Sequence, residues 1–202
     1  MTQRYACATC TAKACVKGGD FPENCPTQRE AHRIETTIAE ASVDSFAAQV
    51  MTAAAQTPHH ANGVARSRVE EAIAFCQQME WQTIGIAFCM MFAKEARVLA
   101  DMFSAAGFTV VPVCCKVGGV GLLDLGVETP CAQRGPACNP ITQATLMNAQ
   151  QTDVNIMLGL CVGHDLLFTR ASGAPVLTLA VKDRALKHQP LDALRPRAVE
   201  TN

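Results

Sequence analysis

The chain has 202 residues, of which 49% are hydrophobic and 17% are charged, with a net charge of −1 and eleven cysteines. This length suits one domain with a small appendage, and the low charge and high apolar content exclude a disordered chain or a coiled coil. A charge balance so close to zero argues against nucleic acid as a partner, because nucleic-acid-binding domains ordinarily carry a basic face.

The amino terminus lacks the apolar stretch of a secretory signal, and the longest strongly apolar run, residues 84–93, is too short to span a bilayer. We therefore expect a cytoplasmic protein with no membrane partner. Cytosolic thiols stay reduced, so clustered cysteines there indicate metal binding or catalysis rather than a disulfide framework. The odd cysteine count also disfavours complete intramolecular pairing.

The first predicted element is a cysteine-rich metal-binding segment, residues 1–26, which has four cysteines and little apolar periodicity. We expect this segment to need a metal to hold its shape. A helix capped by Thr27 then runs to Gln56. A second helix covers about residues 64–80 and places Cys76 on its apolar face, where we interpret Cys76 as a core residue.

The remainder of the chain alternates between short apolar runs and helical patterns. Four apolar runs are typical of buried strands: residues 83–89, 109–115, 155–161 and 175–181. The helical patterns cover about residues 92–106 and 140–150, and a short helix follows Gly163. This order predicts an α/β domain, residues 27–202, built as a three-layer α/β/α sandwich on a mainly parallel sheet of about four strands.

Three of the four predicted strands end in cysteine. The cysteines concerned are Cys89, Cys114, Cys115 and Cys161. Ligand sites of doubly wound sheets lie outside the carboxyl ends of the strands, so we expect these thiols to converge on one edge. The alternative is that cysteine serves there only as a small core residue, where each strand finishes.

The long connection 116–139 adds two more cysteines, Cys131 and Cys138, to this candidate set. Connections of such length are commonly functional when they have no secondary structure of their own. Asn139 is predicted to cap the helix that Pro140 begins, which places Cys138 beside a positive helix end. That position favours the thiolate, the form that binds metals. We expect three or four of the six thiols to hold an iron–sulfur cluster.

The turn after the third predicted strand contains Cys161, His164 and Asp165. A thiol, an imidazole and a carboxylate together suit catalysis, with a nucleophile or metal ligand beside groups that transfer protons. The alternative is that His164 and Asp165 only complete the start of a helix. Lys182 and Arg184 follow the last predicted strand, where we interpret them as a solvated strand exit rather than an anion site.

The four amino-terminal cysteines have the spacing of a metal site, because a C-x2-C pair precedes two further cysteines within twenty residues. They are Cys7, Cys10, Cys15 and Cys25. Four thiolates fit structural zinc or a four-iron cluster equally well. We favour the cluster narrowly, because the ending Cys25-Pro26 is similar to that of bacterial ferredoxin motifs, although the third spacing differs.

Several of these motifs together resemble a microbial family of cysteine-rich, predicted metal-binding proteins built on a domain of unknown function. The resemblance covers nearly the whole chain and is most specific in its last third. It implies metal binding and names no substrate. The motifs that carry it are Cys7-x2-Cys10-x4-Cys15, Cys25-Pro26, Cys138-Asn139-Pro140-Ile141, Gly159-Leu160-Cys161-Val162-Gly163-His164-Asp165 and Val181-Lys182-Asp183-Arg184.

Two classes of function follow from these residues. The first is an iron–sulfur-dependent enzyme that removes or transfers sulfur, or carries out a reduction, on a small-molecule substrate. The second is a non-enzymatic protein that transfers electrons to a redox partner protein or handles a metal, zinc or iron–sulfur. The residues leave the substrate and the oligomeric state open.

Overall fold

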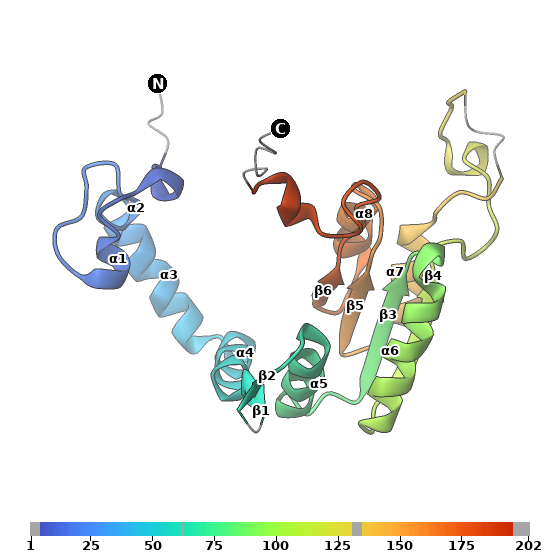
Figure 1. Ribbon diagram of the computed structural model, residues 1–202, viewed down its shortest axis with the longest axis horizontal. Helices are drawn as coiled ribbons and strands as arrows, with labels where there is room; N and C mark the ends of the chain where they lie inside the picture. Colours follow the sequence, from blue (N-terminus) through green and yellow to red (C-terminus); the bar gives the residue numbers. More distant parts are fainter. Residues whose placement is uncertain (1–4, 62, 131–134, 196–202) are drawn as a thin grey trace, which may run out of the picture. The chain divides into compact units, whose positions relative to one another are not determined.

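A computed structural model describes residues 5–61, 63–130 and 135–195 of the chain. The chain divides into two compact units, Met1–Gln56 and Thr57–Asn202, which are described separately below (Figure 1). The boundary predicted after residue 26 falls inside the first of these units. As the limit of a metal-binding segment, that boundary stays a prediction.

The first unit consists of short helical pieces at its amino-terminal end, followed by two longer helices. In chain order these are η1 (Cys7–Thr9), α1 (Ala14–Lys17), α2 (Pro26–Arg29), α3 (Ala31–Val43) and α4 (Ser45–Gln56). The predicted single helix from Thr27 is wrong in two respects, because Cys25 is the cap of α2 and the helix is interrupted twice. At Asp44 the cause is clear: its carboxylate accepts hydrogen bonds from the amides of Phe46 and Ala47, and so starts a new helix.

Very few side chains of the first unit are buried. Among its described residues only Ala14 and Ala53 are buried, and both are small. The apolar side chain of Ile38, in the middle of α3, is 63% exposed. Hydrophobic burial therefore contributes little to the order of this unit.

The second unit begins with a hairpin of two very short strands, β1 (His60–Ala61) and β2 (Val64–Ala65). The helix expected from residue 64 starts later, as α5 (Arg68–Gln78). Ser67 and Glu70 form a reciprocal capping box there, which fixes the start of the helix.

A four-stranded parallel sheet forms the centre of the second unit, as predicted. Its strands are β3 (Thr83–Phe88), β4 (Thr109–Cys114), β5 (Val154–Leu158) and β6 (Val176–Ala180), in the spatial order β4-β3-β5-β6. The helices between them are α6 (Ala93–Ala105), α7 (Pro140–Ala149) and α8 (His164–Ala171), with 3-10 turns η2 (Met90–Phe92), η3 (Leu123–Leu125) and, after β6, η4 (Pro190–Ala193).

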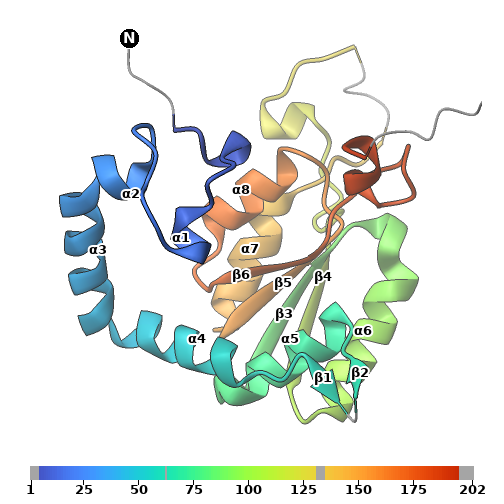
Figure 2. The ribbon, with the colours of Figure 1, turned by 60° about the vertical axis from the view of Figure 1, so that its left-hand side comes forward.

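The crossovers place these helices in two layers. The connection from β3 to β4 runs one way across the sheet and that from β4 to β5 runs the other way, so right-handed crossovers put α6 and α7 on opposite faces (Figure 2). Helix α8 packs beside α7, and α5 lies on the same face as α6. The predicted three-layer α/β/α sandwich is confirmed.

The core lies between the sheet and both helix layers. Its largest fully buried side chains include Ile84 and Ile156 of the central strands, Phe103 of α6 and Phe168 of α8. Cys76 belongs to the same core and is fully buried, as predicted, and burial raises the pKa of its thiol to about 12.

Strand β4 is an edge strand and contains Pro112. The amides of Thr109 and Cys115 donate hydrogen bonds inward to carbonyls beside or in β3, those of Gln82 and Phe88. Backbone groups of a parallel strand alternate in direction, so the nitrogen of Pro112 faces the free edge.

None of the helices in the described ranges combines the length and the apolar character needed to cross a bilayer.

Candidate thiol and lysine site at the sheet edge

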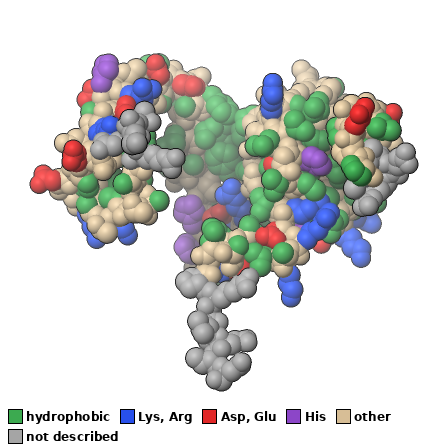
Figure 3. Space-filling model, turned by 90° about the horizontal axis from the view of Figure 1, so that it is seen from above, with side chains coloured by type: hydrophobic (Ala, Val, Ile, Leu, Met, Phe, Trp, Pro, Cys, Tyr) green, Lys and Arg blue, Asp and Glu red, His purple; other side chains and the backbone are tan. Residues whose placement is uncertain are grey.

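The order of the strands reverses between β3 and β5, and ligands of doubly wound sheets bind outside the carboxyl ends at such a point. Cys89 directly follows β3, and Cys161 lies three residues after β5. The two cysteines therefore flank the switch in strand order, as the sequence led us to expect. Figure 3 shows that the second unit exposes both apolar and basic side chains, and its colouring counts cysteine as apolar.

Lys182 lies between these two thiols. Its ammonium nitrogen is 2.6 Å from Sγ of Cys89 and 3.2 Å from Sγ of Cys161. Burial works against the charge of Lys182, but the two sulfurs outweigh it and raise the pKa of the ammonium group. Burial alone would raise the pKa of Cys89. Hydrogen bonds from Lys182 and from the Met91 amide outweigh burial, so the pKa of Cys89 is lowered.

A second pair of thiols, Cys115 and Cys138, lies beside the first. Their sulfur atoms are 3.7 Å apart, and the amide of Met90 donates to Sγ of Cys115 at 3.4 Å. Burial raises the pKa of Cys115 to about 12, and the neighbouring thiols Cys138 and Cys89 act in the same direction. Cys115 is therefore protonated at neutral pH, whereas Cys89 ionises more readily than Cys115.

The two pairs form one continuous group, because Cys89 and Cys115 also interact with each other. We call Cys89, Cys115, Cys138, Cys161 and Lys182 the edge cluster. Four of the six predicted cofactor-binding thiols are thus brought together from four separate segments. Cys114 instead packs half-buried against the core, and Cys131 lies outside the described residues.

A fully buried glutamine supports the strand ends beneath the edge cluster. The side-chain amide of Gln143 in α7 donates to the carbonyl of Phe88 at 3.3 Å and to that of Val113 at 2.7 Å. Both carbonyls also belong to the sheet: the Cys115 amide donates to the Phe88 carbonyl, and the register of β3 and β4 places the Phe88 amide opposite the Val113 carbonyl. Gln143 therefore adds a second hydrogen bond to each of these two carbonyls and ties α7 to the strand ends directly before the cysteines.

The predicted proton-transfer residues lie at the start of α8. Burial lowers the pKa of His164, with Lys182 adding to the effect, so the imidazole is neutral at neutral pH. Burial raises the pKa of Asp165, and one of its carboxylate oxygens is buried without a hydrogen-bond partner among the described residues. Within the described ranges, Asp165 therefore has an unsatisfied acceptor oxygen at the start of α8.

The amino-terminal cysteines lie in the first unit. Cys7, Cys10 and Cys25 line one cavity of about 260 Å³, whereas Cys15 is exposed and does not line it. The Thr27 hydroxyl, through a hydrogen bond, lowers the pKa of Cys25. Across the described ranges of both units, no three His, Cys, Asp or Glu side chains already stand close enough to hold a metal ion.

Sequence reasoning missed two residues of the site, Lys182 and Gln143. Lys182 was interpreted as solvated, but its side chain is partly buried against two thiols. The available signal was its position two residues after β6, at the same edge as the cysteines. Gln143 gave no signal, since a single glutamine within a helical pattern is ordinarily exposed.

Fold and site together define a doubly wound α/β protein with a thiol and lysine cluster at the switch point of its sheet. The chain belongs to the family described as "Protein of unknown function (DUF1847)", whose model matches residues 25–179. It is also 37% identical, over 194 residues, to the uncharacterized protein MJ0455 of Methanocaldococcus jannaschii, covering 93% of this chain and 92% of that protein. The expected membership of a family of unknown function is confirmed.

Proposed function

We propose that the protein binds an iron–sulfur cluster at the carboxyl edge of its sheet and acts there on a small sulfur-containing or reducible substrate. The observation that carries this proposal is the edge cluster itself. Four thiols that are far apart in the sequence meet at the position where doubly wound folds bind their ligands. Four cysteine thiolates are the ordinary ligand set of an iron–sulfur cluster.

In this proposal Cys89, Cys115, Cys138 and Cys161 hold the cluster. When bound, it would supply a reservoir of electrons. If only three of the four thiolates are ligands, the iron left without one would also supply a Lewis acid. The high pKa of Cys115 means that loading must remove a proton from a buried thiol, so a metal that stabilises thiolate is required.

The chain's own residues would then handle charge and protons. Lys182 balances the negative charge of the sulfurs and holds an anionic substrate group nearby. Neutral His164 accepts or donates a proton, and the unpartnered oxygen of Asp165 accepts a hydrogen bond from the substrate. Asp165 and His164 act as a pair, since each shifts the other's pKa.

We propose a second metal in the first unit, held by Cys7, Cys10 and Cys25 together with Cys15. Support comes from the cavity that the first three cysteines already share. An iron–sulfur cluster there would feed electrons to the sheet edge, whereas zinc would only order the segment.

The alternative function is electron transfer or metal handling without catalysis. The unpartnered Asp165 oxygen favours the enzyme, because a carrier site needs no such acceptor for a substrate.

The test is anaerobic purification of the full chain with iron, sulfide and zinc analysis. The variants Cys115→Ala and Cys114→Ala form a matched pair, since the two cysteines are adjacent but only Cys115 belongs to the edge cluster. We expect Cys115→Ala to lose the iron of the sheet edge and Cys114→Ala to keep it. Equal iron in both variants, or zinc alone in the parent protein, would exclude the proposed cluster.

A further inference from the structure

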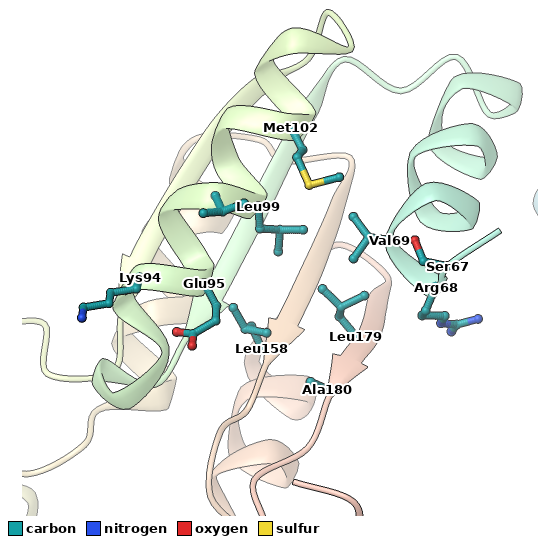
Figure 4. Close-up of a pocket in the computed structure, with 11 residues that line it drawn as sticks. Ser67, Arg68, Val69, Lys94, Glu95, Leu99, Met102, Leu158, Leu179 and Ala180 are labelled. Carbon is teal, nitrogen blue, oxygen red and sulfur yellow. The ribbon is translucent and has the colours of Figure 1, made fainter. Parts of the chain in front are cut away.

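An apolar groove lies on the face of the sheet covered by α5 and α6. It has a volume of about 670 Å³, within the range of pockets that bind small organic molecules. Its floor is formed by Leu158 of β5 and by Leu179 and Ala180 of β6, and its walls come from the two helices (Figure 4).

One end of the groove adjoins the edge cluster. Leu158 and Ala180 are the last residues of their strands, and Cys161 and Lys182 follow them by three and two residues. Two residues of extended chain span about 7 Å. The groove therefore ends within two or three residues of Cys161 and Lys182, although neither side chain lines it.

The same end of the groove carries unpaired positive charge. Arg68 and Lys94 lie in the first turns of α5 and α6 and form no ion pair within the described ranges. One carboxylate, Glu95, also lines the groove, so the lining has a net charge of +1. Figure 4 shows Glu95 beside Leu158 and Lys94 on the outer side of α6, with Met102 further along α6 toward the other end of the groove.

We infer that this groove binds an organic anion with an apolar aromatic or alkyl body. The body lies against Val69, Leu99 and Met102, and the anionic group lies at the sheet edge near Arg68, Lys94 and Lys182. This inference rests on the proposed function: the anion is the substrate, and it carries its sulfur or reducible group at the anionic end. The groove then supplies binding energy remote from the reacting group.

The test compares two fluorescent probes on the full chain: anilinonaphthalene sulfonate, and N-phenylnaphthylamine, which has the same apolar body without the sulfonate. We expect the sulfonate to bind more tightly, and the double variant Arg68→Gln/Lys94→Gln to weaken its binding about tenfold while leaving the uncharged probe unchanged. Equal affinity of the two probes for the parent protein, or no binding of either, overturns the inference.

Two further variants locate the binding. Val98 lines the groove and is 59% exposed, and Leu146 is a comparably exposed leucine on α7, outside the groove. Val98→Glu is expected to weaken sulfonate binding about tenfold and Leu146→Glu to leave it unchanged, with circular dichroism confirming that both fold. An equal loss in both variants places the probe elsewhere and overturns the inference.

Iron is measured on the same samples, so that the two proposals fail separately. Probe binding in the groove of a chain that takes up no iron keeps the binding site and removes the proposed function. Iron at the sheet edge without probe binding keeps the proposed function and removes the binding site. The link between the groove and the edge cluster is tested by the rate at which Cys161 is alkylated in metal-free protein. We expect the bound sulfonate probe to slow this alkylation. Equal alkylation with and without the sulfonate removes that link.

Discussion

Residues 5–56 bury only two side chains, both alanines, whereas the α/β unit buries a continuous core of aromatic and branched side chains. Ordering a residue costs about 1–2 kcal/mol of backbone entropy, which burial must offset in a unit without other support. The second unit meets this cost with apolar packing. The first unit has little apolar packing, so other interactions must stabilise it. In our proposal its four cysteines do so by binding a metal.

The largest effect is expected from removing that metal. Structural metal sites contribute about 10 kcal/mol or more to small domains, so a strong chelator should unfold the first unit and leave the second intact. Limited proteolysis before and after chelation measures this, with new cleavage expected in α3 and α4 and none in the sheet. Identical cleavage patterns would show that no metal holds the first unit together.

A core truncation tests the other side of the comparison. Phe168 of α8 is fully buried, so Phe168→Ala should lower the free energy of unfolding by about 3–5 kcal/mol. Ile38→Ala in α3 removes an exposed side chain and should change it by less than about 0.5 kcal/mol. Urea titrations measure both values, and a large loss in Ile38→Ala would show that α3 has a packing partner.

Gln143 links the core to the edge cluster, so its replacement should affect both. Gln143→Leu removes the two hydrogen bonds to the Phe88 and Val113 carbonyls and should lower the free energy of unfolding by about 1–3 kcal/mol. It should also lower iron at the sheet edge, because Cys89 and Cys115 lose their support. The same change at exposed Gln77 is the control. Normal stability and iron content in Gln143→Leu would remove this positioning role.

The smallest effect concerns the capping box of α5. Ser67→Ala should lower the free energy of unfolding by about 1 kcal/mol at neutral pH.

The pH dependence of stability tests the other half of the capping box. Hydrogen bonds from the Ser67 amide and hydroxyl lower the pKa of Glu70. The stabilisation that ionised Glu70 gives the folded protein is therefore complete above the ordinary glutamate range and is lost as the pH falls through the lowered pKa. Thermal unfolding from neutral to acid pH should therefore be less pH-dependent in Glu70→Gln than in the parent protein.

The fold of the second unit could be predicted because its strands are unbroken apolar runs, and strands of that kind occur in parallel sheets covered on both faces. The same reasoning located Cys89 and Cys161, since parallel strands end at one edge. The β1–β2 hairpin could not be found, because strands of two residues are too short to show alternation. The position of Lys182 after the last strand places it at the same edge, but that position does not distinguish a solvated ammonium group from one held between Cys89 and Cys161.

Pro112 on the outer edge of β4 has a consequence for assembly. An exposed edge strand offers its amides to any other strand that approaches, and a second copy of the chain could extend the sheet there. Pro112 presents no N–H group at the middle of that edge, so strand addition would lose a hydrogen bond where pairing should be strongest. Association of two copies through a continuous sheet is therefore disfavoured at β4, and the edge formed by β6 is the one left for such pairing.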